Sequence, residues 1–408
     1  MLETSESKER SNPVRKFLKL PFRGMLPLFV LAHFSHHLLN ALPVPLLPMI
    51  RNEFALDYTR SGFVIAAFSL SYGIGQLPAG WLADRIGSRI LITMGICGVA
   101  LAGLLLGLSH TYIMMVVFLV LMGLLGGGYH PAAPPLIAAA VEPRNRGRAL
   151  GFHTIGGGAS FFLAPLIAAA VASVWGWRGS FITLAVPSMI FGIVFYIILK
   201  RWTGINEAKH TIIGSYDQPK PTRNNMRHLI AFIILTTLSG AVTMSVISFI
   251  PLFVVDRFGV SEEVAAVLIA VIYSAGLWAG PLGGYLSDRL GRIPVMLAVC
   301  FITGPVIYLL GLVPYGLGIG VVLVSIGIIT YIRMPTSEAY IINHTSERHL
   351  STVLGVYYFG NMEGAGIVTP VIGHLIDRFG FYSSFTIAAA AILAVTLICS
   401  IFLWGSRD

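Results

Sequence analysis

The stretch GWLADRIGSR, residues Gly80 to Arg89, carries an aspartate and two arginines between two strongly apolar stretches of the chain. A second copy, GYLSDRLGRI from Gly284 to Ile293, repeats the pattern Gly-x-Leu-small-Asp-Arg-x-Gly after another apolar stretch. A charged loop that follows an apolar stretch at both places indicates one structural unit that is present twice.

The composition places the chain among integral membrane proteins. Of its 408 residues, 56% are hydrophobic and 11% are charged, and the mean hydropathy is +0.81, which is far outside the range of soluble domains. A helix of about 20 apolar residues crosses a bilayer, so the sequence predicts twelve membrane spans and no soluble domain. The spans are expected near residues 25–50, 59–83, 90–109, 111–141, 149–173, 180–200, 229–255, 262–286, 293–312, 315–342, 351–376 and 382–404.

The positive charges indicate how these spans are oriented. With both termini on one side, Arg333 lies inside a span and few basic residues lie on the far side. The far-side residues are Arg51, Arg60, Arg178, Arg257 and Arg378. Because cytoplasmic loops are enriched in Lys and Arg, we expect a multi-pass protein of the cell membrane with both termini in the cytoplasm. The net charge of +9 therefore reflects topology, and the scattered basic residues do not favour a nucleic-acid partner.

Matches at one fixed offset divide the chain into two related units. An offset of 204 residues superimposes the two charged loops and further residues in three other regions. The pairs are Asp84 with Asp288, Arg85 with Arg289, Pro131 with Pro335, Gly151 with Gly355, Gly176 with Gly380 and Phe181 with Phe385. The longest polar segment lies between the units and contains two prolines. We therefore predict a six-helix bundle over 1–200, a cytoplasmic linker over 201–226 and a second bundle over 227–408.

The two charged loops resemble the signature loop of the major facilitator superfamily in motif, copy number and position. This resemblance covers nearly the whole chain and implies an all-α membrane fold of two six-helix bundles. A central cavity, lined mainly by spans 1, 4, 7 and 10, would open alternately to each side. The resemblance also implies a cytoplasmic gate formed by Asp84, Arg85, Asp288 and Arg289, in which a carboxylate meets a helix N-terminus or a basic side chain. A loop that only anchors topology would not explain the paired aspartates.

Polar residues of the first span form one stripe. Ionisable groups are costly inside a bilayer unless they face a wet cavity, so they are the candidate functional residues. In HFSHHLLN, a rotation of about 100° per residue brings His33, His36, His37 and Asn40 onto one face. We expect His33 to carry protons and His37 and Asn40 to bind substrate, while His36, at the edge, hydrogen-bonds a neighbouring helix. No carboxylate or cysteine lies nearby, so neither a metal site nor a cofactor is expected.

The fourth and tenth spans carry the next candidates. In GLLGGGYHPAAPP, we expect Pro131 to disrupt the backbone beside Tyr129 and His130 and to place both side chains at a cavity wall. The offset places Arg333 opposite Tyr129. An arginine stays charged and needs an anionic partner. That partner is either a carboxylate of the protein, Glu338 or Glu363, or the substrate itself.

The eleventh span carries Asn361, a candidate substrate ligand, and Glu363 within the segment YYFGNMEGAGIVTP. A carboxyl group among glycines and apolar residues is expected to hold a proton near neutral pH, as a proton carrier must. We therefore expect Glu363 and Glu338 to take part in proton coupling. The alternative for Glu363 is a permanent pairing that tethers span 11 to span 10.

The fifth span bears on the direction of transport. GFHTIGGGASFFLAPLIAA resembles the antiporter motif of the superfamily, with small residues at most of its glycine positions. The segments YHP and GGGASFFLAPLIAA are similar to the fosmidomycin-resistance and drug–proton antiporter branch. No arginine occurs between Arg89 and Arg144, so the arginine that is common in the fourth span of proton–drug antiporters is absent.

These features predict a secondary transporter that exports a small amphiphilic or anionic compound in exchange for protons. It would work as a monomer in the lipid bilayer by alternating access. The alternative is a proton-coupled uptake symporter for an organic anion, with Arg333 as the carboxylate clamp. A membrane receptor or an embedded metalloenzyme is disfavoured, because the chain shows no sensory domain and no HExxH or GxSxG motif.

Overall fold

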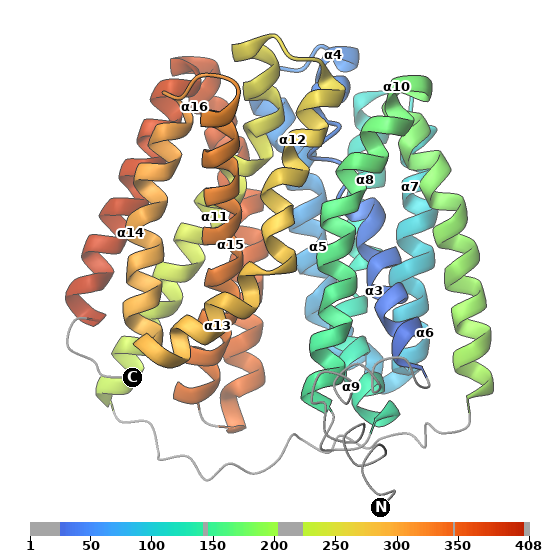
Figure 1. Cartoon of the computed structure of the whole chain (residues 1–408). Helices are drawn as coiled ribbons and strands as arrows, with labels where there is room; N and C mark the ends of the chain where they lie inside the picture. Colours follow the sequence, from blue (N-terminus) through green and yellow to red (C-terminus); the bar gives the residue numbers. More distant parts are fainter. Residues whose placement is uncertain (1–24, 142–145, 203–222, 346, 404–408) are drawn as a thin grey trace, which may run out of the picture.

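The computed structural model describes residues 25–141, 146–202, 223–345 and 347–403, and these residues are almost entirely helical. The labels follow Figure 1. The helices before residue 203 are α3 (Leu26–Asn40), α4 (Leu47–Phe54), α5 (Tyr58–Ile86), α6 (Ser88–Thr93), η1 (Met94–Gly98), α7 (Val99–Gly107), α8 (Tyr112–Gly126), α9 (Tyr129–Ala140) and α10 (Arg146–Arg201). The later ones are α11 (Arg223–Phe258), α12 (Glu262–Ser274), η3 (Ala275–Leu277), α13 (Ala279–Leu290), α14 (Arg292–Leu310), α15 (Leu317–His344) and α16 (Glu347–Leu403).

The predicted all-α membrane fold is confirmed. In the described part of the chain, eight helices are long and apolar enough to cross a membrane, or nine if α12 and α13, bent by 43°, form one span. The longest two, within α10 and α16, each hold two spans, because their backbones leave helical geometry at Gly176 and Gly380. Together with α3, these helices account for the twelve predicted spans.

Backbone geometry repeats at the same offset as the sequence. Gly87 has φ 89° and ψ 139°, and Gly291, 204 residues later, has φ 93° and ψ 145°. Gly176 and Gly380 likewise share φ values of 66° and 74°. A positive φ is easily adopted only by glycine, so these four glycines turn the chain at equivalent points of a duplicated unit.

Three spans are interrupted where the sequence predicted continuous helices. The first ends at Asn40 and resumes as α4 at Leu47, because Pro43 and Pro45 lack the backbone N–H groups of a helix interior. The eighth bends between α12 and α13. The fourth breaks at Gly127–Gly128. Pro131 has no N–H group to bond the carbonyl oxygen of Gly127, so its predicted disruption fits this break, but the break lies before Tyr129 and His130 and not just beyond them.

The helices form two groups side by side, α3 to α10 in the first half and α11 to α16 in the second (Figure 1). The halves meet where α5 packs on α16 and α10 packs on α12. Glycines permit the close approach of α5 and α16: a Cβ on Gly62 would lie 2.8 Å from Cα of Pro370, and one on Gly366 would lie 2.7 Å from Cγ of Leu70. The predicted linker lies mostly outside the described residues, so the exact domain limits stay a prediction.

Polar contacts between the halves gather at the upper end of Figure 1, away from the start of α3. Arg51 and Tyr58 both hydrogen-bond Asp256, and Asn52 hydrogen-bonds Glu262. Because the offset relates Asn52 to Asp256 and Tyr58 to Glu262, the Tyr58–Asp256 and Asn52–Glu262 bonds are equivalent by the internal symmetry.

A further contact at this end completes the N-terminus of α5 with a residue of the other half. Asp377 accepts hydrogen bonds from the backbone N–H groups of Tyr58 at 2.9 Å and Thr59 at 2.8 Å. The first N–H groups of a helix have no partner within it, and they favour a negative charge. We name this set of contacts the upper latch. Its residues are Arg51, Asn52, Tyr58, Thr59, Asp256, Glu262 and Asp377.

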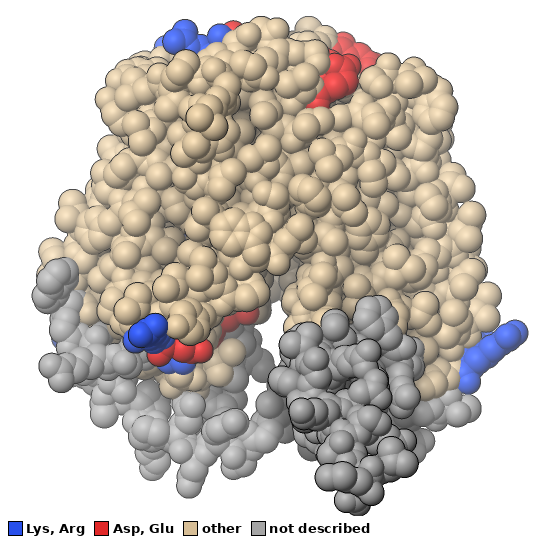
Figure 2. Space-filling view, viewed as in Figure 1, with Lys and Arg blue, Asp and Glu red and all other residues tan. Residues whose placement is uncertain are grey.

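The opposite end is hollowed. In Figure 2, the space-filling surface is divided at its lower end by a gap between the two halves. Along the face shown, the charged side chains of the described residues lie near the two ends and leave a broad apolar band between them (Figure 2), as expected for a surface in contact with lipid tails. The structure is therefore joined at the upper end and open at the lower end.

Candidate functional site

The polar stripe predicted on the first span lies in the interior of the first half. His33, His36, His37 and Asn40 project from α3 and are each at most 9% exposed. The long helix α10 packs along α3. A Cβ on Gly157 of α10 would lie 2.7 Å from the ring of His33, so glycine at this position leaves the space that the imidazole occupies.

Four aromatic rings from three helices lie nearly parallel in this interior. The ring of His36 stacks on Tyr129 at 4.3 Å and 9°, and His33 stacks on His153 at 4.1 Å and 6°. His33 and Tyr129 lie 5.6 Å apart at 12°. Because α3, α9 and α10 each contribute to this column, their packing fixes the ring orientations.

Hydrogen bonds assign different roles to the two deeper histidines. His36 donates from Nδ1 to the carbonyl oxygen of Gly95 at 2.9 Å and accepts from the hydroxyl of Tyr72 at 3.1 Å. Both of its nitrogens are satisfied, so it joins neighbouring helices. His33 donates from Nδ1 to the carbonyl oxygen of His153 at 2.8 Å, whereas its Nε2 is buried without a partner. This tautomer leaves a lone pair on Nε2.

His37 and His130 meet beside this column. Their Nε2 atoms lie 3.2 Å apart, and Nδ1 of His37 is buried without a partner. His37 is 9% exposed and His130 is half-buried. Nitrogens of His33, His37 and His130 all lie within 4.8 Å of one another. Asn40 lies 3.5 Å from His36 through its amide nitrogen, and Tyr129 is fully buried.

Arg333 occupies the corresponding interior of the second half. It is 9% exposed and donates from Nη1 to the carbonyl oxygen of Thr236 on α11 at 3.1 Å. A Cβ on Gly240 would collide with Nη1 of Arg333 and with Oδ1 of Asn361, so both polar groups lie against this glycine. Among the described residues, no carboxylate lies within ion-pair distance of Arg333.

The two carboxylates expected beside Arg333 lie elsewhere. Glu338 accepts a hydrogen bond from the hydroxyl of Tyr358 at 2.9 Å. Glu363 is 2% exposed, its two oxygens lack partners, and it lies against Gly73 of α5, where a Cβ would overlap its carboxyl group. Glu363 is therefore buried between the two halves of the molecule. The alternative of a pairing that tethers span 11 to span 10 has no support from the contacts of the described residues.

The predicted gate residues lie at the lower end, near the positive-φ glycines. The Asp288 carboxylate is 3.6 Å from Arg292 within its own loop, and Arg289 donates to the hydroxyl of Tyr285 at 3.0 Å. Arg85 stacks on Trp81 at 4.0 Å. The side chain of Asp84 is outside the described part of the structure.

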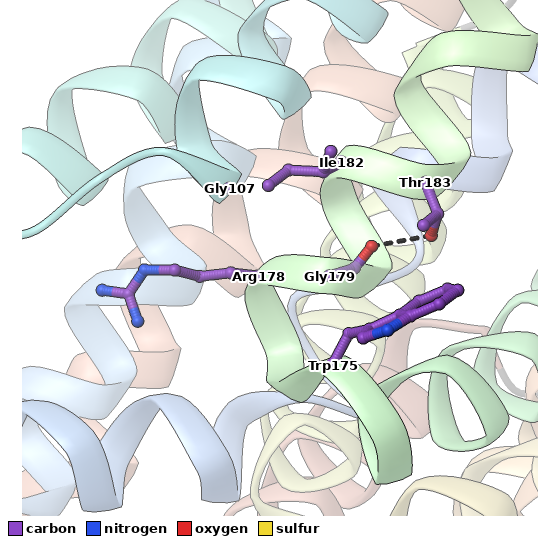
Figure 3. A pocket seen from close by; sticks show the side chains of 6 residues that line it. All are labelled: Gly107, Trp175, Arg178, Gly179, Ile182 and Thr183. Atoms are coloured by element: carbon purple, nitrogen blue, oxygen red, sulfur yellow. Dashed lines mark hydrogen bonds between the residues drawn. The ribbon is translucent and has the colours of Figure 1, made fainter.

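A surface hollow lies at the upper end of the first half, and the one charged side chain among its lining residues does not point into it. It is lined by Gly107, Trp175, Arg178, Gly179, Ile182 and Thr183 (Figure 3). The guanidinium of Arg178 points away from it (Figure 3) and bonds Glu53 and the carbonyl oxygen of Ser109. Although burial opposes it, hydrogen bonds from Arg178 and Trp177 hold the pKa of Glu53 below its ordinary value. Through Arg178, these bonds anchor α10 to α4 and to the loop before α8.

The sequence analysis missed several residues of this interior and of the upper latch. We call His33, His36, His37 and His130 the histidine cluster. Tyr72 and His153 pack around it, yet nothing in one sequence shows that α5 and α10 meet α3 there. For the latch a signal existed, because the offset pairs Asn52 with Asp256 and Tyr58 with Glu262.

Comparison with known proteins gives a family and several relatives. The profile of the Major Facilitator Superfamily matches residues 29–360 and 232–408. A Multidrug resistance protein MdtG of Citrobacter koseri is 27% identical over 357 residues, covering 85% of this chain and 84% of that protein. A Probable L-galactonate transporter of Escherichia coli is 33% identical over 152 residues, which cover 37% of this chain and only 34% of that protein.

Solved structures share the fold at low sequence identity. A bacterial homologue of the human lysosomal transporter Spinster, in an inward-facing and occupied conformation, has a TM-score of 0.76 at 17% identity over 97% of each chain. A POT family transporter bound to a thioalcohol-conjugated peptide has a TM-score of 0.80 at 14% identity, over 94% of this chain and 97% of that chain.

Proposed function

The chain belongs to the major facilitator superfamily, and we propose that it exports a small amphiphilic or anionic compound in exchange for protons. As a member of this family it is a secondary transporter, a multi-pass membrane protein that moves a small molecule, and it is not an enzyme. Export, proton coupling and the substrate class are our additions. A multidrug resistance protein that matches 85% of this chain supports export.

The buried carboxyl group of Glu363 carries the proposal of proton coupling. An ionised carboxylate without a hydrogen-bond partner is very costly in an apolar interior, so Glu363 packs against Gly73 in its neutral, protonated form. The contact joins α5 of one half to α16 of the other. Loss of the proton therefore destabilises the arrangement in which the upper end is closed.

This contact suggests a cycle of exchange. Substrate enters from the open lower end, and Glu363 gives up its proton towards that side. The ionised carboxylate cannot stay against Gly73, so the halves part at the upper end and release the substrate there. Glu363 then takes a proton from the upper side and the upper end closes. Each proton supplies about 2.3 kcal/mol at about 100 mV, which supports a substrate gradient of more than tenfold.

The burial of Arg333 supports the proposal that the substrate carries an anionic group. A buried guanidinium without a carboxylate is unfavourable, and a bound anion would supply the missing charge. The planar guanidinium also suits a carboxylate or phosphonate, which it can bind through two hydrogen bonds. We propose that Arg333 and Asn361 bind the substrate from the second half, and that His37, Asn40, Tyr129 and His130 line its path in the first.

Uptake of an organic anion together with protons is the second candidate. Its support is the partial similarity to a Probable L-galactonate transporter, whose named substrate is a carboxylate that Arg333 could hold. The two candidates differ in the relative direction of proton and substrate. Either would be carried out by a monomer, because one chain supplies both halves.

We propose that the lower end faces the cytoplasm, as the positive charges indicate. The structure then corresponds to an inward-open state that the upper latch holds closed on the outer side. The carboxylate of Asp377 makes two backbone hydrogen bonds in this latch, each of about 1 kcal/mol. Removing them should favour the outward-open state.

Asp377→Ala is therefore expected to shift the equilibrium towards the outward-open state by roughly ten- to thirtyfold. Spin labels at His110 and Pro314, exposed residues of the upper end related by the offset, report the opening as a longer distance in electron-spin resonance. Glu263→Ala is the matched control, because it removes a carboxylate at the same end that lies outside the latch. Equal distance distributions in Asp377→Ala and the control would show that the latch does not hold the outer side closed.

Asp84→Asn is expected to slow the interconversion of the two states more than it weakens substrate binding, because its loop lies at the cytoplasmic end and away from the interior site. Asp288→Asn, at the equivalent position, should act in the same direction. Binding titration and flux on one preparation separate the two effects. Weakened binding with normal flux per bound substrate would contradict a role in the gate.

Internal drug levels in cells test export directly. Escherichia coli that produces the chain is given fosmidomycin or L-galactonate, with and without a protonophore. Export predicts a lower internal concentration than in cells with an empty vector, and the protonophore should abolish the difference. A higher internal concentration in the producing cells supports uptake, and a difference that survives the protonophore contradicts proton coupling.

A further inference from the structure

The histidine cluster of the first half places several ring nitrogens close together, which neither substrate binding nor proton transfer requires. The three residues His33, His37 and His130 bring one ring nitrogen each to within 4.8 Å of the others. Sequence reasoning disfavoured a metal because no carboxylate or cysteine lies near the histidines of the first span in the sequence. The structure replaces His36, whose nitrogens are both occupied, with His130 from α9.

The spacing of His37 and His130 is that of two ligands on one ion. Zn²⁺ binds histidine nitrogen at about 2.0–2.1 Å, and its sites are tetrahedral, which places neighbouring ligand atoms about 3.3–3.4 Å apart. The two Nε2 atoms lie 3.2 Å apart. The ring nitrogen of His33 lies within 4.8 Å of the other two nitrogens. Small rotations of the side chains would bring it to the ligand spacing of the same ion.

His33 is prepared as the third ligand by its surroundings. Histidine ligands commonly donate their other ring N–H to a backbone carbonyl, which fixes the tautomer and the ring. His33 does so through the carbonyl oxygen of His153 at 2.8 Å, and its Nε2 is left buried with no partner. A buried lone pair without a donor is unfavourable, and a bound cation would satisfy it. The stack on His153 holds the ring in place.

One side of the cluster is accessible. His33 and His37 are buried, whereas His130 is half-buried, so an ion can enter beside His130. Three imidazoles leave a tetrahedral ion one open position, as in catalytic zinc sites. The neutral imidazole is a ligand of borderline metal ions such as Zn²⁺, Co²⁺, Ni²⁺ and Cu²⁺, and it is a poor ligand for Mg²⁺ or Ca²⁺.

We propose that His33, His37 and His130 bind one divalent transition-metal ion of the Zn²⁺ class, with the fourth position open on the side of His130 to water or to an anionic ligand. The site lies wholly within the first half, so it is separate from Arg333 and Glu363. An ion there joins α3 to α9 and places a positive charge in the interior of the first half. His33 then acts as a ligand rather than as a proton carrier.

Zinc binding to the purified full-length protein tests this site. The protein carries a purification tag without histidine, is stripped with a chelator, and is titrated with Zn²⁺ against a fluorescent zinc indicator. One Zn²⁺ per chain with a micromolar or tighter Kd is expected. His37→Ala and His130→Ala should each raise the Kd at least about 100-fold, since losing even an outer-shell partner of a ligand costs about 10- to 100-fold. Co²⁺ should give the intense visible bands of a tetrahedral complex.

Two variants control for effects on folding. His153→Phe keeps a ring in the stack and keeps the backbone carbonyl that orients His33, so it should bind Zn²⁺ like the parent protein. His110→Ala removes an exposed histidine outside the cluster and should also leave the Kd unchanged. The proposal is overturned if the parent binds less than one Zn²⁺ per chain in this range, or if both ligand variants bind as tightly as the controls. It can fail without affecting the proposed exchange of protons, which rests on Glu363.

Discussion

Glu363→Gln is expected to abolish substrate accumulation driven by a pH gradient and also to slow substrate exchange at equal pH strongly, because the upper end opens only when Glu363 has lost its proton. Glutamine has the shape of protonated glutamate and lacks an ionisable group, so it can pack against Gly73 but cannot release a proton. Exchange of labelled for unlabelled substrate needs no net proton movement, but it does need the opening of the upper end that ionised Glu363 drives. Flux assays on purified protein in vesicles, with and without a gradient, measure both quantities on one preparation.

Glu338→Gln is the matched control for this experiment. It makes the same chemical change in a second, half-buried carboxyl group, one that already has a hydrogen-bond partner in Tyr358. We expect it to retain gradient-driven accumulation, in contrast to the sequence-based expectation that Glu338 also takes part in proton coupling, because Glu338 bonds Tyr358 within the second half and not across the two halves. If accumulation survives in Glu363→Gln and is lost in Glu338→Gln, Glu338 is the proton carrier, and the role of the contact with Gly73 must be abandoned.

Arg333→Lys is expected to lower transport by roughly 10- to 100-fold, because one charge-assisted hydrogen bond contributes about 1.5–3 kcal/mol and lysine cannot bind a planar anion through a fork of two N–H groups. Transport of labelled fosmidomycin at several concentrations checks the effect. Arg257→Lys, at an exposed position of the upper end, is the control for the substitution itself. Near-normal transport by Arg333→Lys would show that position 333 needs only a positive charge.

The fold was predictable because the sequence contains the six-helix unit twice. The offset that pairs Asp84 with Asp288 also pairs glycines with matching positive φ, at Gly87 and Gly291, so sequence repetition reports repeated backbone geometry. The interruptions were harder to place. Sequence reasoning placed the break in span 4 beside Tyr129 and His130, whereas the chain breaks at Gly127 and Gly128, three to four residues before Pro131, where the carbonyl oxygen of Gly127 loses the N–H partner that a proline cannot supply.

The candidate site was predictable along each helix and not between helices. Periodicity placed His33 and His37 on one face of α3, but the approach of His130 depends on how α9 packs against α3, and that of His153 on α10. The expected partners of Arg333 illustrate the same limit. Glu338 follows Arg333 on α15 and Glu363 lies on the next helix, α16, yet Glu338 pairs with Tyr358 and Glu363 lies against Gly73, because the helix faces direct both carboxyl groups away from Arg333.

Coupled flux in vesicles tests the exchange of protons for substrate most directly. Purified protein is reconstituted into vesicles that hold a pH-sensitive dye, and labelled fosmidomycin is added outside under an imposed pH gradient. With an acidic interior, exchange predicts accumulation of fosmidomycin inside together with a rise of the internal pH, and neither change in vesicles with Glu363→Gln. Accumulation that requires an acidic exterior, or that proceeds equally without any gradient, would contradict the exchange mechanism.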